Sequence, residues 1–304
     1  MSRLPALPIA CSPFNPALCE DQASRDRFTR EVERTQQLNL PGVVRIIDQH
    51  LDHQPPFFVM ELVEGKPADA ALIGASPDRI ARVFRNLCAT LDQAHAAGVI
   101  HCDLKPGNIL VRNDDSVMVM DFGISVLSGA TPTEKSSSTT LLGTPAFIAP
   151  EMIRGGQRGA PADIYSLGVL LFKVLTGREP FVGQTVHDII QAHLYEDPPP
   201  PAAFNPAVAD GLQRIYLKAL EKNPAERYAG ARTMTDDLDR FLRGEVVRTR
   251  PTVYDNLLLY FQNLPTWPKV LMSLGAICFL TALYRELRRT RGNSIDDVVI
   301  QSRL

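Results

Sequence analysis

A short stretch near the middle of the chain gathers side chains that suit the transfer of a phosphoryl group. It reads His101-Cys102-Asp103-Leu104-Lys105-Pro106-Gly107-Asn108 and is followed by Asp121-Phe122-Gly123. Phosphoryl transfer needs an acceptor that orients the attacking hydroxyl and cations that neutralise charge on the transferred group. Asp103 is a candidate proton acceptor and Lys105 a candidate phosphate contact. Asn108 and Asp121 are candidate Mg²⁺ ligands, because that ion prefers hard oxygen donors.

The segments around this stretch must bring its side chains to one place. Residues 109–111 and 117–120 are apolar runs that flank the turn-forming residues 112–116, which predicts a β-hairpin. A hairpin places Asn108 and Asp121 at adjoining strand ends. Upstream, Ser76 is suited to cap a long amphipathic helix that Gly98 terminates.

The remaining elements follow from periodicity and from turn residues. A helix is predicted over residues 24–38, and short apolar runs predict adjacent strands over 43–48 and 57–61. After Asp163 the pattern is helical, with helices predicted over 163–175, 185–194, 208–220 and 234–242.

Composition narrows the class of protein. The chain has 304 residues, of which 45% are hydrophobic and 22% charged, as in globular proteins. A net charge of −2 gives no electrostatic reason to expect nucleic acid as a partner. The five cysteines are scattered and lack C-x-x-C spacing, which favours a reducing compartment over a disulfide framework or a zinc site.

Further motifs follow the first stretch in a fixed order. They are Gly143-Thr144-Pro145, Ala149-Pro150-Glu151, the run that begins at Asp163, and Arg227. Together with the first stretch they resemble the bacterial Hanks-type Ser/Thr protein kinases, with Cys102 where the family usually carries arginine. The resemblance implies an α+β, two-lobed kinase-like fold. It consists of a small, incomplete mixed N-lobe over 1–64, a mostly helical C-lobe over 65–244 and a tail over 245–304.

The resemblance assigns roles to the residues already singled out. Asp103 and Lys105 are the expected catalytic residues, and Asn108 and Asp121 the expected ligands of Mg²⁺ that accompanies ATP. His101 is expected to orient the loop, and Asp163 to accept hydrogen bonds from its backbone. Glu151 and Arg227 are expected to form an ion pair, and Thr144 to bond Asp103 and Lys105. The hydroxyl cluster at 136–140 is either a site of autophosphorylation or a polar loop.

The N-terminal region departs from the family. Met60 matches the gatekeeper position, and the backbones of Glu61 and Val63 are the expected adenine contacts. Glu31 matches the glutamate that pairs with the N-lobe lysine, or else is a surface carboxylate. No lysine precedes Lys66, and no G-x-G-x-x-G occurs in the first 65 residues. Three hypotheses remain: an active kinase for protein substrates, a pseudokinase scaffold or regulator, and a lobe completed by a partner chain or by residues upstream of a misassigned start.

The tail has a composition of its own. Residues 270–284 are 15 residues without a charge, which is short of the about 20 that a spanning helix needs. Trp267 precedes them, and an arginine cluster follows from Arg285 to Arg291. This pattern favours contact with a membrane surface, and hence a cytoplasmic protein attached to the inner membrane. The alternative is a helix that packs on protein.

Overall fold

The computed structural model describes residues 9–13, 40–50, 53, 57–122, 145–156 and 158–247. The chain divides into two compact units, Met1–Thr249 and Arg250–Leu304, and every described residue belongs to the first. The predicted helix over 24–38 with Glu31, the loop over 123–144 with Thr144, and the apolar segment 270–284 lie outside the described residues.

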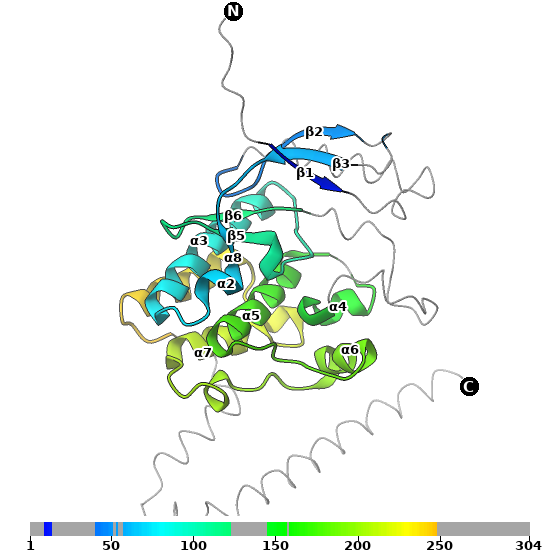
Figure 1. Ribbon diagram of the computed structural model, residues 1–304. Coiled ribbons are helices and arrows are strands. Elements are labelled where there is room, and N and C mark those ends of the chain that lie inside the picture. The colour runs from blue at the N-terminus through cyan, green and yellow to red at the C-terminus, as the bar shows by residue number, and fades with distance from the viewer. Residues whose placement is uncertain are drawn as a thin grey trace, which may run out of the picture. The chain divides into compact units, whose positions relative to one another are not determined.

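Three antiparallel strands form the first sheet (Figure 1). They are β1 (Ile9–Pro13), β2 (Ile46–His50) and β3 (Phe57–Glu61), in the order β1-β3-β2. The strand at 57–61 and its pairing with a neighbouring strand are confirmed. The sequence pattern does not predict β1, which pairs with β3 in a register that sets Cys11 opposite Val59.

The strand predicted over 43–48 was placed too early, since β2 begins only at Ile46. Val43 and Val44 are buried, as their apolar character suggests, but they pair with a different sheet. The Val44 amide donates to the carbonyl of Val119, and the Val119 amide donates to the carbonyl of Gly42. The backbone of residues 42–44 therefore joins the region of the first sheet to the hairpin that carries Asn108 and Asp121.

The second sheet is the predicted hairpin with one short added strand. β4 (Lys66–Pro67), β5 (Ile109–Val111) and β6 (Val117–Val119) pair antiparallel in that order. Between β4 and β5 come α2 (Ala68–Leu72) and the long helix α3 (Pro77–Ala96). Ser76 caps α3 as predicted, accepting the Arg79 amide, and Gly98 adopts the left-handed conformation just beyond its end.

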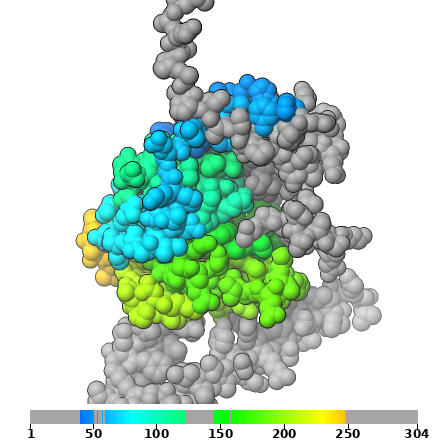
Figure 2. Space-filling model, viewed as in Figure 1, coloured from blue at the N-terminus to red at the C-terminus, as the bar shows by residue number. Residues whose placement is uncertain are grey.

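Helices make up the rest of the unit, around a hydrophobic core. They are α4 (Pro150–Ile153), α5 (Ala160–Thr176), α6 (Val186–Tyr195), α7 (Asp210–Ala219) and α8 (Ala231–Leu242). The buried helix α5 contacts both α2 and α7, and α3 packs against α8 (Figure 1). In the space-filling view the cyan residues of α2 and α3 lie directly against the green residues below them (Figure 2). The described part is thus an α+β fold, as predicted.

None of the helices described is both long and apolar enough to cross a bilayer.

Candidate active site

The loop between α3 and β5 is held by the buried ring of His101. The Asp103 amide donates to Nδ1 of His101 at 3.2 Å, and Nε2 lies 2.9 Å from the Met120 carbonyl oxygen. Because Nδ1 accepts, Nε2 carries the ring proton and donates to Met120. The ring also packs against Phe122, with centroids 4.7 Å apart. The predicted structural role of His101 is confirmed: it joins the loop to the segment that contains Asp121.

Asp163, at the start of α5, holds the same loop through hydrogen bonds. Its carboxylate is fully buried and accepts the amides of His101, at 2.9 Å, and Cys102, at 2.7 Å. This confirms its predicted role. A third donor, which was not predicted from the sequence, is His95, whose Nε2 lies 2.8 Å from Asp163 Oδ2.

One oxygen of the Asp103 carboxylate accepts hydrogen bonds from two side chains. Lys105 Nζ lies 2.7 Å from Oδ2, and Asn108 Nδ2 lies 3.1 Å from the same atom. Asn108 Nδ2 also donates to the backbone carbonyl of Asp103 at 2.9 Å. The structure therefore brings three of the predicted residues into direct contact.

The hairpin brings Asn108 and Asp121 to one end of the second sheet. The Met120 amide donates to the Asn108 carbonyl at 3.0 Å, so Asp121 follows directly after the residue opposite Asn108. Asp121 adopts a left-handed backbone conformation with φ +60°. Burial raises the pKa of Asp121, with nearby Asp103 adding to this and His101 and Lys105 opposing it.

The donors at this end of the sheet fit a magnesium ion that also binds phosphates. Within the described residues the Asn108 side chain makes two hydrogen bonds, and Nδ2 is the donor in both. Its Oδ1 is therefore available to bind a cation. No group of three or more His, Cys, Asp or Glu able to hold a metal occurs in the described part of the chain. Mg²⁺ commonly uses one or two protein ligands together with substrate phosphates, and this arrangement suits that mode.

The segment after β3 carries the predicted adenine contacts. The Glu61 amide donates to the Arg45 carbonyl at 3.0 Å, but the Arg45 amide donates to Oε1 of the Glu61 side chain instead of closing the ladder. Within the described residues the Val63 amide has no backbone partner, and the Arg45 amide does not use the Glu61 carbonyl. An antiparallel ladder would normally pair the Arg45 amide with the Glu61 carbonyl, so the Glu61 side chain takes the place of a backbone acceptor beside the buried Met60.

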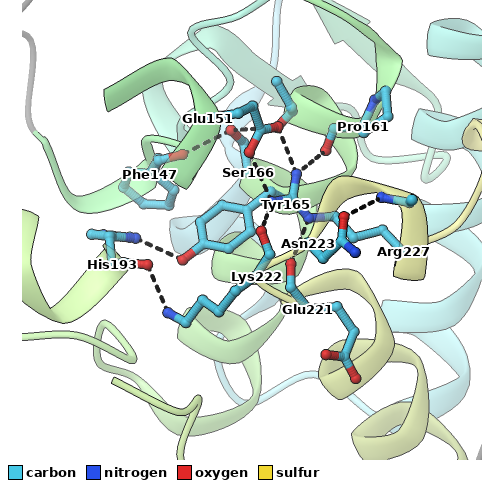
Figure 3. A network of polar contacts seen from close by, with 12 residues as sticks. Phe147, Glu151, Pro161, Tyr165, Ser166, His193, Glu221, Lys222, Asn223 and Arg227 are labelled. Atoms are coloured by element: carbon cyan, nitrogen blue, oxygen red, sulfur yellow. Dashed lines mark hydrogen bonds and ion pairs between the residues drawn. The ribbon is translucent and has the colours of Figure 1, made fainter. Parts of the chain in front are cut away.

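A buried ion pair holds the segment that begins at residue 145 (Figure 3). Arg227 binds Glu151 in a bidentate way, with Nη1–Oε1 at 2.7 Å and Nη2–Oε2 at 2.8 Å. Arg227 also donates to the carbonyls of Pro161, Glu221 and Lys222. The predicted pair is confirmed, and it fixes α4 against the start of α5 and the turn after α7.

The site combines residues that local patterns reveal with residues that they do not. Asp103, Lys105, Asn108 and Asp121 were visible through their spacing. His95 and Arg45 were not, because each acts on a partner that is distant in the sequence and neither belongs to a motif. Glu31 and Thr144 are outside the described residues.

Comparison with known proteins identifies the family. A family model described as the protein kinase domain matches residues 17–238. A probable serine/threonine-protein kinase of Streptomyces coelicolor is 32% identical over 246 residues, covering 79% of this chain and 37% of that protein. Serine/threonine-protein kinase PknB of Mycobacterium tuberculosis is 35% identical over 235 residues, covering 75% of this chain and 38% of PknB.

A solved structure agrees with the fold. The PknI kinase domain of Mycobacterium tuberculosis superposes with a TM-score of 0.60 at 24% identity, covering 76% of this chain and 85% of that one. The curated relatives are longer, since the match spans under two fifths of their length, 37% and 38% in the two cases. The chain belongs to the protein kinase family, among the bacterial Hanks-type Ser/Thr kinases.

Proposed function

We propose that this chain transfers the γ-phosphoryl group of ATP to serine or threonine hydroxyls of protein substrates. One observation carries the proposal: Lys105 Nζ and Asn108 Nδ2 converge on Oδ2 of Asp103, at 2.7 and 3.1 Å. The relatives from Streptomyces coelicolor and Mycobacterium tuberculosis carry the name serine/threonine-protein kinase, which agrees with the proposal. Members of this family use ATP and typically Mg²⁺.

Asp103 orients the substrate hydroxyl and accepts its proton as the phosphoryl group is transferred. The carboxylate is held in place by its two donors, and such positioning lowers the entropic cost of bringing the reactants together. Lys105 stands beside it, where its ammonium group can offset negative charge on the transferred phosphoryl. The ion pair between Asp103 and Lys105 thus fixes the positions of the proton acceptor and of one cation.

Asn108 Oδ1 and the Asp121 carboxylate would hold Mg²⁺. That ion, when bound, supplies charge neutralisation on the phosphates of ATP. The chain's own contribution is to fix the two ligands, through the β5–β6 pairing and the bond between the Met120 amide and the Asn108 carbonyl.

The backbone after β3 would recognise adenine. The Glu61 carbonyl is an acceptor for the exocyclic amino group, and the Val63 amide is a donor for a ring nitrogen. The support is that the Val63 amide lacks a backbone partner within the described residues, and that the Arg45 amide binds the Glu61 carboxylate and not the Glu61 carbonyl.

A pseudokinase scaffold or regulator is the alternative function. It is favoured by the absence of lysine before Lys66 and of a glycine-rich phosphate loop in the first 65 residues. A partner chain that completes the N-lobe, with Glu31 pairing to a lysine from elsewhere, would reconcile these absences with activity. We place the protein in the cytoplasm, where ATP is available, with the apolar segment 270–284 contacting the inner membrane.

Transfer of radiolabelled phosphate from ATP tests the proposal. In the full chain, Asp103→Asn keeps the side-chain volume but removes the acceptor charge, and should lower turnover by about 10²–10⁴-fold. Asp121→Asn should lower turnover to a similar extent, because it weakens a proposed metal ligand. Asp114→Asn, an exposed residue on the same hairpin, is the matched control and should retain full turnover.

Two outcomes would contradict the proposal. Transfer that is unchanged in Asp103→Asn would remove the assigned acceptor. A wild-type chain that binds no Mg·ATP in calorimetry and transfers no phosphate, alone or with generic acceptors such as casein, would favour the pseudokinase.

A further inference from the structure

We propose that His193 is a positioning residue for the protein substrate, because it connects α6 to the turn Pro145–Phe147 that follows Thr144. This segment is called the 145–147 turn below. The inference rests on the proposed function, since it concerns how an acceptor protein binds. His193 belongs to none of the sequence motifs, and the proposed phosphoryl transfer does not use it.

The ring of His193 is fully buried and connects two elements through its two nitrogens. Nδ1 lies 2.8 Å from the hydroxyl of Tyr165 on α5 (Figure 3). Nε2 interacts with the carbonyl of Ala146 in the 145–147 turn. A carbonyl can only accept, so Nε2 carries the ring proton and Nδ1 accepts the proton of the Tyr165 hydroxyl. The ring therefore connects α5 to the turn.

The interaction between Nε2 and the Ala146 carbonyl falls short of a full hydrogen bond. Within the described residues, this buried nitrogen has no other partner. A buried donor that lacks a full hydrogen bond costs free energy, so closer approach of the carbonyl is favourable. His193 therefore favours positions of the 145–147 turn that lie close to α6.

The backbone around His193 is itself fixed. Lys222 Nζ donates to the carbonyls of His193, at 2.7 Å, and Ala192, at 3.2 Å, near the C-terminal end of α6, where positive charge is favourable. The ring of Phe181 packs against His193, with centroids 4.8 Å apart. Burial and the charge of Lys222 lower the pKa of His193 to about 3, so the ring stays neutral and keeps one proton to donate.

Helix α5 also holds the end of the 145–147 turn. Ser166 Oγ donates to the Phe147 carbonyl at 2.8 Å (Figure 3). The Ile148 amide donates to the Pro145 carbonyl at 3.3 Å and closes the turn. The residue between these contacts is the one that His193 reaches, so this histidine sets the middle of the turn.

The 145–147 turn adjoins a residue that is expected beside the proton acceptor. Thr144 precedes it directly and is expected to bond Asp103 and Lys105. A protein substrate must bring its hydroxyl to Asp103, and the residues next to that hydroxyl then lie against the backbone that continues from Thr144. Displacement of the turn should therefore weaken binding of a protein substrate and leave the proposed adenine contacts and metal ligands unchanged.

Two substitutions separate the roles of the two ring nitrogens. His193→Asn keeps an acceptor near the position of Nδ1 but has no group at the position of Nε2. His193→Gln carries an N–H donor near the position of Nε2. His187→Gln, at an exposed position of the same helix, controls for a general effect on α6. All variants are made in the full chain.

Hydrogen exchange of the Ile148 amide reports on the turn without turnover, because this amide closes the turn. In His193→Asn its exchange should be faster than in wild type by about tenfold or more. In His193→Gln and His187→Gln it should remain within about threefold of wild type. Neither ATP nor an acceptor is needed, so this result stands even if the proposed phosphotransfer fails.

Steady-state kinetics with casein as the acceptor then test the effect on the substrate. His193→Asn should raise KM for casein by about tenfold, with little change in KM for ATP. His193→Gln should remain close to wild type in both. A role in stability alone would lower the amount of active enzyme, and hence the apparent kcat, and would leave both KM values unchanged.

The outcomes decide the inference separately from the proposed function. Equal exchange of the Ile148 amide in His193→Asn and His193→Gln overturns it. An unchanged KM for casein in His193→Asn overturns it wherever the wild type transfers phosphate. Where the wild type transfers none, the proposed function fails and the exchange result alone decides whether His193 holds the turn.

Two further measurements keep the test decisive. Nitrogen-15 NMR of the wild type should find the ring proton of His193 on Nε2, and a proton on Nδ1 instead overturns the inference. If His193→Asn does not fold, Tyr165→Phe replaces it, because it removes the hydroxyl that holds Nδ1. Exchange of the Ile148 amide should then be faster than in wild type, and unchanged exchange overturns the inference.

Discussion

Single side chains in the catalytic loop act mainly on backbone groups. His101 bridges the Asp103 amide and the Met120 carbonyl, and Asp163 gathers two successive amides. These contacts explain how a loop without regular structure can hold Asp103 and Lys105 in one geometry. The proposed phosphoryl transfer needs only a few functional groups, and these contacts hold them in place.

His193 on α6 is a buried group outside this loop. Its side chain is fully buried, and Nδ1 lies 2.8 Å from the Tyr165 hydroxyl (Figure 3). Burial, together with the positive charge of Lys222, lowers the pKa of His193 from 6.5 to about 3. His193 therefore stays neutral in the folded protein across the range in which an exposed histidine gains a proton.

We predict that His193 makes the protein less stable in mild acid. As the pH falls from 7.5 to 5, the unfolded chain binds a proton at His193 and the folded chain does not, so the free energy of unfolding falls. Linkage between pKa values of 6.5 and about 3 gives about 2 kcal/mol over this interval. Urea unfolding of wild type and His193→Gln at both pH values measures the effect as a change in their stability difference.

The control for this prediction is His187→Gln, which removes an exposed histidine from the same helix. Comparing the two variants separates burial from the general titration of the protein. Parallel loss of stability in wild type and His193→Gln between pH 7.5 and 5 would show that His193 gains its proton equally well in the folded state.

Which contacts of single residues can be predicted from the sequence depends on how close the two partners lie along the chain. Spacing reveals Asp103, Lys105 and Asn108 because all three lie in one loop of a few residues. His95 contacts Asp163 across 68 positions, and Arg45 contacts Glu61 across 16. A single histidine near a helix end, or one arginine before a strand, carries no local signal of such a partner.

At the scale of elements, α3 connects the parts of the site. Arg79 and Asn86 hold the hairpin turn through Asp115. Arg79 Nε lies 2.8 Å from Oδ1 of Asp115, and the Asn86 side-chain Nδ2 donates to the Asp115 carbonyl at 3.0 Å. At the other end of the helix, His95 reaches Asp163. One helix thus fixes both the hairpin that carries the proposed metal ligands and the loop that carries Asp103.

Helix α3 also packs closely against residues 42–44, the segment that precedes β2. Gly42 has φ +84°, and a Cβ atom built there would lie 2.4 Å from Oγ1 of Thr90 on α3. Thr90 has little freedom to move away, because it is β-branched and its hydroxyl donates to the Asn86 carbonyl. Close approach of the 42–44 segment to α3 and β6 therefore requires glycine.

We predict that Gly42→Ala destabilises the protein more than Gly74→Ala. Gly74 also has a left-handed backbone, φ +80°, but a Cβ atom there meets nothing within 4 Å. Gly74→Ala should cost about 1 kcal/mol from backbone strain alone, and Gly42→Ala about 2–3 kcal/mol because steric overlap is added. Urea unfolding measures both. Adding Thr90→Ala to Gly42→Ala should recover the steric part, and equal losses at the two glycines would show that the contact with Thr90 is unimportant.

Elements with local signals were predicted well, and the failures share a cause. The caps and periodicity of α3 and the turn of the β5–β6 hairpin lie within the segments themselves. Val43 and Val44 look like the start of β2, but the Val44 amide and the Gly42 carbonyl bond to Val119 instead. β1 contains Cys11, Ser12 and Pro13, which have little strand character, and it exists through pairing with β3. Long-range pairing decides both cases.

At the scale of the whole molecule, the kinase unit extends slightly past its last helix. Val247 lies beyond α8 yet is buried in the core, and its side chain lies close to Gly211 on α7. A chain that ends at Gly244 loses this contact, whereas one that ends at Thr249 keeps it. Residue 249 is also where the first compact unit ends, so it is the better end point for a test of the tail.

We predict that the tail attaches the full chain to membranes and that residues 1–249 alone stay soluble. The uncharged segment 270–284 lies between Trp267 and the arginines that begin at Arg285, and interfacial aromatic and basic residues favour binding at a membrane surface. A spanning helix would put those arginines on the opposite side of the membrane from the kinase unit, which we propose to be cytoplasmic, so we expect shallow insertion.

Fractionation of expressing cells measures this attachment. The full chain should pellet with membranes and resist a high-salt wash, because burial of apolar side chains is insensitive to screening while purely electrostatic binding is not. Replacing Leu274 and Phe279 with Asp in the full chain should release it without removing the arginines. Full-length protein that is soluble and monomeric without detergent would instead favour a tail that packs on protein. Release by salt alone would assign the attachment to the arginine cluster.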